Sequence, residues 1–362
     1  MKKKLRNKVA NAKAPAADGP RRKFKIRNDG SPPWPELEEQ FIIPAGPRSS
    51  KWWDFFKDGI NNSGLAMWLA DRHTFYLRYV CGYDREQYAE PIEFGNVFHW
   101  LIEQWHQNPG KMKKPFNRLV EDYHPEWMEK APTLTPKQKD TQSSFYGMAA
   151  AMWPFYADKY ADDLKKRNRQ VEREFRAPHR LADGTVVNLY GTVDLEWAGQ
   201  NGGIEIIDHK TTSFINDDER RALINLDLQL MLYAWARFRE TGVVTETIIH
   251  DVIRKSTLKM GGKETPQSFG KRIAGKVAAD PGYFFARYPS GVHKRKLKLY
   301  AKTIIKPIME DFASWARGDS PHYINPNALV GRYGPSKFFG PITTGNFGGL
   351  PRKRPTTRGV EI

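Results

Sequence analysis

Three consecutive segments with the pattern of β-strands, followed by a helix and a fourth strand, constrain the fold of this chain most strongly. The segments 171–179, 185–197 and 203–210 alternate or run aliphatic at strand length, and turn-like sequences separate them. The segment 226–240 has the apolar periodicity of a helix, and 246–255 that of a further strand. This order predicts an α/β fold in which an antiparallel three-strand meander, a helix and a strand build one mixed sheet.

Helices are expected on both sides of this core in the sequence. The segments 63–80 and 94–105 carry apolar residues at helical spacing, and a longer helix is expected from about 140 to 168. After the last strand, 256–285 reads as a basic connection that contains glycine, and 295–317 reads as helical.

The charge of the chain points to a polyanionic partner. The 362 residues carry a net charge of +17, and the first 27 contain eleven Lys or Arg against the single acid Asp18. This segment has too few apolar residues to fold alone, so we expect a disordered basic arm. A solubilising or localisation tail is the alternative interpretation of the same residues.

Composition also limits the cellular location and the cofactor classes. No apolar run approaches the length of a transmembrane helix, and the basic start lacks the apolar stretch of a secretory signal. One cysteine, Cys81, cannot build an intramolecular disulfide, a four-cysteine zinc site or an iron–sulfur cluster. These features favour a reducing, cytoplasmic location.

The strand 203–210 ends in charged residues that fit a metal site. Asp208 and Lys210 share one face of the strand, because side chains alternate. If Trp197 pairs with Glu205 across the preceding turn, Asp194 lies opposite Asp208 on the same face. Two carboxylates at that distance repel unless a cation lies between them, and oxygen ligands suit Mg²⁺.

Other segments supply what a phosphodiester site would still need. His99 is a candidate metal ligand, and Gln229 and Tyr233 lie four apart on one helical face, where they can donate to phosphate. Lys210 is placed to orient a water or to stabilise developing negative charge. Each residue has a structural alternative: a core histidine, a polar edge of a helix, or a surface ion pair between Asp208 and Lys210. Their combination on elements that one core brings together favours a functional site.

These residues resemble the motifs of the PD-(D/E)XK nuclease superfamily, within it the RecB-like and Cas4-like exonuclease branch. Gly95–His99 is similar to the GxxxH helix motif of that branch, and Gly191–Asp194 to its GxxD strand. Asp208–Lys210 is similar to the acid-x-lysine strand, and Gln229–Tyr233 to the QxxxY helix. The resemblance implies a restriction-endonuclease-like core with helical extensions on both sides.

The resemblance also implies roles for these residues. Asp194 and Asp208 would bind Mg²⁺ or Mn²⁺ together with His99 and the main-chain carbonyl of His209, and Lys210 would act on the attacking water.

Four more residues are candidates. Of the two glutamates on the first strand, Glu172 and Glu174, the second is favoured as a contributor, and Glu103 is a further candidate on the helix of His99. Arg254 and Lys255 follow the last strand at the border of the expected site, so we expect them to bind phosphate.

The resemblance extends to both ends of the matched region. The segment 63–82 is similar to the opening segment of the branch, where iron–sulfur members carry a cysteine, and Asp71 stands near that place. The segment 323–335 is similar to the closing segment, where those members carry three more cysteines. No iron–sulfur cluster is therefore expected, and apolar packing is expected to join the two ends.

The function predicted from these observations is a metal-dependent DNA exonuclease acting in recombination, repair or phage DNA metabolism. Two alternatives stay open: a DNA-binding or scaffold protein of the same fold that does not cut, and a structure-specific or restriction-like endonuclease. The polarity, the preferred strand and the choice between DNA and RNA stay undetermined. The chain contains no GxxxxGK[ST] motif, so any unwinding would come from a partner such as a helicase or recombination protein.

The expected domain organisation has three parts. They are an arm and proline-rich lead-in (1–50), a nuclease domain (51–340, with a helical part 51–168, a core 169–256 and a helical part 257–340) and a basic irregular tail (341–362).

Overall fold

The computed structural model describes residues 48–83, 90–130, 134–331, 334–336, 338–344, 346–347 and 350–352. The chain divides into two units, Met1–Ile42 and Ile43–Ile362, and all described residues belong to the second. The predicted basic arm lies outside the described residues, as do most of the lead-in and most of the tail. Among the residues that are described, no helix is both long and apolar enough to cross a membrane.

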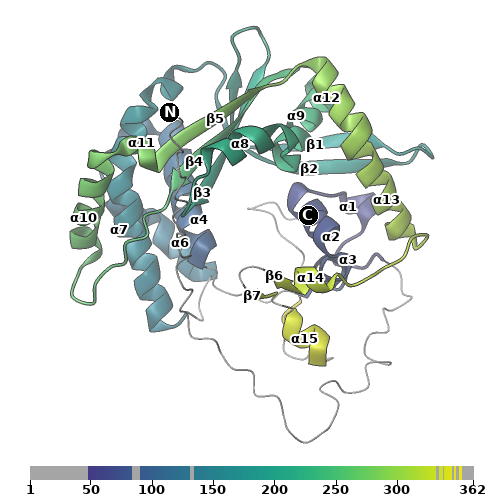
Figure 1. Cartoon of the computed structure of the whole chain (residues 1–362), viewed down its shortest axis with the longest axis horizontal. Coiled ribbons are helices and arrows are strands. Elements are labelled where there is room, and N and C mark those ends of the chain that lie inside the picture. The colour runs from purple at the N-terminus through teal and green to yellow at the C-terminus, as the bar shows by residue number, and fades with distance from the viewer. Residues whose placement is uncertain are drawn as a thin grey trace, which may run out of the picture. The chain divides into compact units, whose positions relative to one another are not determined.

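The predicted mixed sheet is confirmed, with one strand more than expected (Figure 1). Its strand order is β1-β2-β3-β4-β5, in which β3 and β4 run parallel and the other neighbours antiparallel. The strands are β1 (Gln170–Arg180), β2 (Val186–Ala198), β3 (Ile204–Thr212), β4 (Thr245–Arg254) and β5 (Phe285–Gly291).

The connection predicted for 256–285 is wrong in one respect, because it contains structure. It holds the helices α10 (Pro266–Ala279) and α11 (Pro281–Phe284) and runs directly into β5. Strand β5 escapes sequence patterning because it is short and contains Pro289, which is tolerated there because the strand lies at the edge of the sheet.

The predicted register between the second and third strands is confirmed. Trp197 pairs with Glu205, and Leu195 pairs with Ile207. Beyond that pair the side chain of Asp194 replaces the ladder, since its Oδ2 accepts a 2.9 Å hydrogen bond from the backbone N–H of His209. The acid is therefore held at the main chain of the neighbouring strand.

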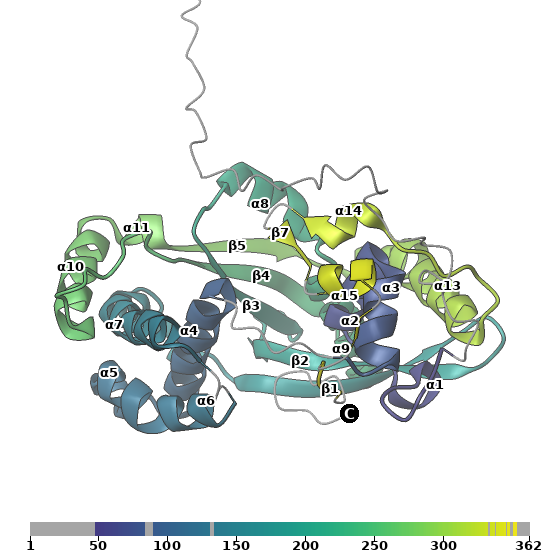
Figure 2. The same cartoon turned by 90° about the horizontal axis from the view of Figure 1, so that it is seen from below.

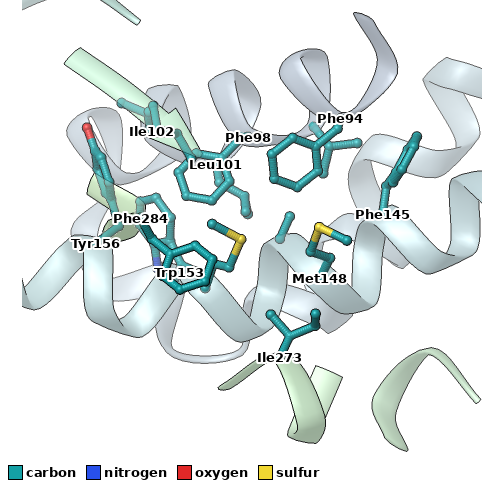
Figure 3. Close-up of a cluster of buried hydrophobic side chains, with 14 of the residues drawn as sticks. Phe94, Phe98, Leu101, Ile102, Phe145, Met148, Trp153, Tyr156, Ile273 and Phe284 are labelled. Atoms are coloured by element: carbon teal, nitrogen blue, oxygen red, sulfur yellow. The ribbon is translucent and has the colours of Figure 1, made fainter. Parts of the chain in front are cut away.

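One face of the sheet is covered by α4 (Glu90–Gln107) and α7 (Pro136–Lys159), with α10 packed on α7. Figure 3 shows buried side chains of α4, α7 and α10 that meet in this core. At the contact of α10 with α7, Gly147 and Gly270 let the helices approach closely: a Cβ at Gly147 would lie 2.1 Å from the carbonyl oxygen of Pro266. The core cluster draws on these helices and on β4 and β5. Its members include Phe94, Phe98, Leu101, Phe145, Met148, Trp153, Tyr156, Ile253, Phe269, Ile273 and Phe285.

The other face of the sheet carries α9 (Leu228–Thr241), which makes the crossover between the parallel strands β3 and β4. Asp227 caps its N-terminus by accepting a hydrogen bond from the Leu230 N–H, and Gly242 ends it in the left-handed conformation. The imidazole Nε2 of His250 lies 3.2 Å from Asp227 Oδ2, which ties the start of α9 to β4.

The helix predicted for 63–80 is broken at Asp71. It consists of α2 (Asn62–Ala70), α3 (Arg72–Phe75) and a π-turn, Tyr76–Val80. Asp71 ends α2 and caps α3, because its carboxylate accepts from the N–H of Thr74 at 2.9 Å. The apolar spacing continues across the break, so periodicity alone does not reveal it.

Two other predicted helices end earlier or are interrupted. Helix α7 stops at Lys159 and is followed by a 3₁₀ turn, Ala161–Lys165, and 295–317 divides into α12 (Lys294–Tyr300), a π-turn (Ala301–Ile305) and α13 (Lys306–Arg317). The remaining short elements are α1 (Phe55–Asp58), α5 (Pro115–Arg118), α6 (His124–Lys130), α8 (Asp217–Leu223), α14 (Pro326–Leu329), α15 (Phe339–Thr344), β6 (Val330–Gly331) and β7 (Gly334–Pro335).

The opening segment 63–82 contacts the chain near the closing segment 323–335, and the contact is polar as well as apolar. Asp71 Oδ1 accepts a 2.8 Å hydrogen bond from the N–H of Asn325, and His73 Nδ1 lies 3.0 Å from His322 Nε2. Phe75 packs edge-on against Trp315, with ring centroids 5.6 Å apart. Apolar packing alone, as expected from the sequence, is therefore an incomplete description of this junction.

Candidate active site

A cavity of about 680 Å³ is lined by residues of α2, α4, β2, β3 and α9. It gathers segments that are up to about 170 residues apart in the chain. Seven residues predicted for the site line it: His99, Asp194, Asp208, His209, Lys210, Gln229 and Tyr233.

Asp194 and His99 face each other across one part of this cavity. The Oδ2 atom of Asp194 lies 3.6 Å from Nδ1 of His99, and both side chains are about 10% exposed. The same oxygen receives the N–H of His209. The main chain of His209 and the side chain of Asp194 therefore share one location, as a metal site using the carbonyl of His209 would require.

Glu172, rather than Glu174, completes this group of ligand atoms. One ligand atom each from His99, Glu172 and Asp194 lie within 4.8 Å of one another. Glu174 is exposed and is not part of the cluster. The backbone of Glu172 explains the difference, because its φ of 47° is left-handed, a strained conformation for a residue with a side chain.

A second line of contacts crosses the cavity from β3 to α9. Lys210 Nζ lies 2.9 Å from Asp208 Oδ2 and donates to Gln229 Oε1 at 2.7 Å. Gln229 in turn donates to the hydroxyl of Tyr233 at 2.9 Å. Gln229 thus orients the lysine, and Tyr233 holds Gln229 in place.

Burial makes the ionised form of Asp208 dependent on nearby positive charge. Burial of Asp208 raises the pKa of its carboxyl, and Lys210 opposes that effect while the charge of Asp194 adds to it. The pKa of Lys210 is raised, because the attraction of Asp208 and Asp194 outweighs the effect of burial. The lysine therefore stays charged, and further positive charge beside Asp208 would favour its ionised form.

The donor set fits a hard divalent cation. Asp194, Asp208, His99 and His209 line the cavity, and a carboxylate oxygen of Glu172 lies within 4.8 Å of ligand atoms of His99 and Asp194. Oxygen-rich sets of this kind suit Mg²⁺ and Mn²⁺.

The side chain of His209 belongs to a buried network on the other side of its strand. Its Nδ1 lies 2.9 Å from Asp251 Oδ2, and that carboxylate accepts the hydroxyl of Tyr156 at 2.5 Å. Arg287 Nε lies 3.4 Å from Asp251 Oδ1 and pairs with Asp163 at 2.6 Å. The network joins β3, β4, β5 and α7 directly beneath the motif, and no pattern in the sequence indicates it.

Some predicted residues lie outside this cavity. Glu103 accepts from the side chain of Gln107 at 3.0 Å, and Arg254 stacks on Tyr283 at 3.7 Å from the ring centroid. Lys255 lines a different cavity next to this one.

Sequence reasoning missed Arg78, which lines the active-site cavity from the π-turn after α3. A single arginine between tyrosines and aliphatics (YLRYV) is the signal that could have singled it out.

Replacing each of the two glutamates of β1 by glutamine in turn separates their roles. Because Glu172 lies beside His99 and Asp194, Glu172→Gln is expected to weaken Mn²⁺ binding by about 10-fold or more. The matched change Glu174→Gln should leave it unchanged. Isothermal titration of Mn²⁺ into the protein without nucleic acid measures both, and the reverse result would place the ligand at Glu174.

The match to a protein family agrees with this geometry. The family model of the PD-(D/E)XK nuclease superfamily matches residues 72–303, which is more than half of the chain and contains all four motifs. No curated protein matches the sequence. Among solved structures, the crystal structure of SSO0001 is similar at 14% identity and a TM-score of 0.22, covering 53% of this chain and 88% of that one.

Proposed function

Because the chain belongs to the PD-(D/E)XK nuclease superfamily, we propose that it is a Mg²⁺- or Mn²⁺-dependent deoxyribonuclease, specifically an exonuclease. The observation that carries the proposal is the convergence of Asp194, Asp208 and Lys210 on one cavity with His99 and the QxxxY pair. Recombination, repair or phage DNA metabolism is the proposed setting, in the cytoplasm and with DNA as the main partner. A helicase or recombination protein that would supply unwinding stays a prediction.

Lys210 is the residue proposed to act on the reacting atoms. Its ammonium is held between Asp208 and Gln229, so it presents a fixed positive charge to the cavity. There it can donate to the attacking water and stabilise charge that develops on the phosphate. A divalent cation held by the acids would polarise the phosphate and lower the pKa of a bound water.

Arg78 and Asn96 are proposed to receive the rest of the phosphodiester. Both line the cavity, Arg78 from the π-turn and Asn96 from α4 one turn before His99. An arginine donates in a fork that fits two phosphate oxygens, and an amide donates one or two further hydrogen bonds.

The two alternatives make different use of this site. A non-cutting scaffold would need no lysine held against a buried acid, which disfavours that interpretation. An endonuclease would use the same residues, so the two activities have to be distinguished by which DNA substrates are cut.

Incubation of the purified protein with linear and closed circular DNA, single- and double-stranded, tests the proposal. With Mg²⁺ or Mn²⁺ we expect linear molecules to be shortened from their ends and circles to stay intact, and EDTA should stop the reaction. Absence of cleavage with every metal would contradict a nuclease. Cleavage of closed circles would contradict a strict exonuclease, and a matching RNA series tests the choice of nucleic acid.

A further inference from the structure

A second cavity, of about 880 Å³, adjoins the candidate active site. It lies between the start of α4, the first half of α7, the end of β3 and the segment 255–260. Figure 2 shows α4 and α7 beside the sheet on this side of the molecule. Apart from Thr211, its lining residues differ from those of the active-site cavity.

The two cavities meet at one residue. Thr211, directly after the motif lysine, lines both of them. Gly95 makes this possible, because a Cβ there would lie 2.8 Å from Thr211 Oγ1. Helix α4 therefore passes close to the end of β3, and the two cavities lie on either side of this one shared residue.

The lining has the chemistry of a polynucleotide site. Lys137, Lys255 and Lys259 bring three positive charges against the acids Glu90 and Asp140. Leu258 and Met260 add partly exposed apolar surface. Seven hydroxyl side chains line the cavity, and those of Thr141, Ser144 and Thr212 donate to backbone carbonyls. The other four can donate to phosphate oxygens: Thr211, Ser213, Ser256 and Thr257.

The wall formed by 255–260 is fixed in place before any ligand binds. The N–H of Lys255 donates to the carbonyl of Thr212 at 2.7 Å, which extends the pairing of β3 and β4. Arg272 on α10 donates to the carbonyl of Lys259 at 2.8 Å and pairs with Glu264 at 2.7 Å. A preformed wall lowers the entropic cost of binding a flexible strand.

We propose that this second cavity binds an unpaired polynucleotide strand next to the scissile phosphate, with the lysines and hydroxyls on the phosphates and the apolar surface against the bases. The inference rests on the proposed nuclease function and deepens it. A cavity of about 880 Å³ is in the range of small-ligand sites, so it offers room for a short stretch of one strand. Base contacts without sequence readout are typical of single-strand sites.

The experiment compares two triple variants with the same change of charge. In one, Lys137, Lys255 and Lys259 are changed to alanine. In the control, the exposed lysines Lys111, Lys113 and Lys114 are changed to alanine; these line neither cavity. Thermal melting verifies that both are folded. Fluorescence anisotropy of a labelled single-stranded oligonucleotide in EDTA, over a series of salt concentrations, gives the affinity without cleavage.

The variant of the second cavity is expected to bind the single strand at least about 10-fold more weakly than wild type. The slope of log affinity against log salt should fall by about two, at about 0.7 per lost phosphate contact. The control should retain both values. Equal affinities of the two variants would overturn the inference, and so would an equal loss for a matching duplex.

Failure of the inference is distinguishable from failure of the nuclease proposal. A wild-type protein that binds the strand through these lysines but never cuts would contradict the nuclease proposal and support the second cavity as a strand-binding site. A protein that cuts while the second-cavity variant binds as well as the control would support the nuclease proposal and contradict the second cavity as a strand-binding site.

Discussion

Lys210→Ala is expected to reduce the rate of phosphodiester cleavage by roughly 10²–10⁴-fold, the range found for removal of a positioned proton-transfer or charge-stabilising group. The lysine is the charged group held closest to Asp208, at 2.9 Å, and Gln229 fixes its orientation. Its removal leaves the buried acid without that charge, so the carboxyl takes up a proton more readily. Affinity for nucleic acid should change far less, because a strand is held at many phosphates.

Single-turnover cleavage of a labelled linear DNA with saturating enzyme measures this loss apart from binding. Lys302→Ala, an exposed lysine that lines neither cavity, is the matched control and should cut like wild type. Asp194→Asn should match the loss of the Lys210 variant and weaken Mn²⁺ binding as well. Full activity in either variant would mean that the reacting site lies elsewhere.

Asp251→Ala is expected to have the largest effect on stability, lowering the free energy of unfolding by about 3–5 kcal/mol. Asp251 is completely buried and accepts from or pairs with His209, Tyr156 and Arg287 at once. Its pKa lies well below the usual range despite burial, because Arg287 and His209 stabilise the ionised form. Without this carboxylate the charge of Arg287 loses one of its two acidic partners and keeps Asp163 and the ring of Tyr160.

Two matched variants separate the network from burial in general. Tyr156→Phe removes one hydroxyl from Asp251 and should cost only about 0.5–1.5 kcal/mol. Asp162→Ala removes an exposed partner of Lys165 and should leave the unfolding curve unchanged. Urea denaturation followed by circular dichroism measures all three. An Asp251 variant as stable as the Asp162 variant would show that the charges are not coupled.

The network also fixes the position of His209 on the motif strand. The His209 side chain is anchored to Asp251 on one side of β3, while its N–H binds Asp194 on the neighbouring strand. Both contacts fix the same peptide whose carbonyl is a proposed metal ligand. The sequence indicated this carbonyl only through a resemblance, and the tertiary structure supplies the physical reason.

Local patterns were sufficient for the first four strands of the sheet and for the motif. Alternation along 203–210 and a short turn before it determine that Trp197 meets Glu205, which brings Asp194 to the main chain of the motif strand. Helical spacing likewise determines that Gln229 and Tyr233 share a face. These relations involve neighbours along a strand, a turn or a helix, so residue order alone specifies them.

Only the tertiary structure decided the features that depend on distant segments. The choice of Glu172 over Glu174 depends on a left-handed backbone that β-patterning does not predict. Arg78 enters the cavity, and Asp251 and Arg287 meet beneath it, through packing of elements far apart in the chain. The second cavity forms where the start of α4, the first half of α7, the end of β3 and the segment after β4 come together. Such contacts arise from the packing of whole elements in three dimensions. The apolar periodicity of one segment predicts which of its faces is buried, but it does not predict which distant segment packs against that face.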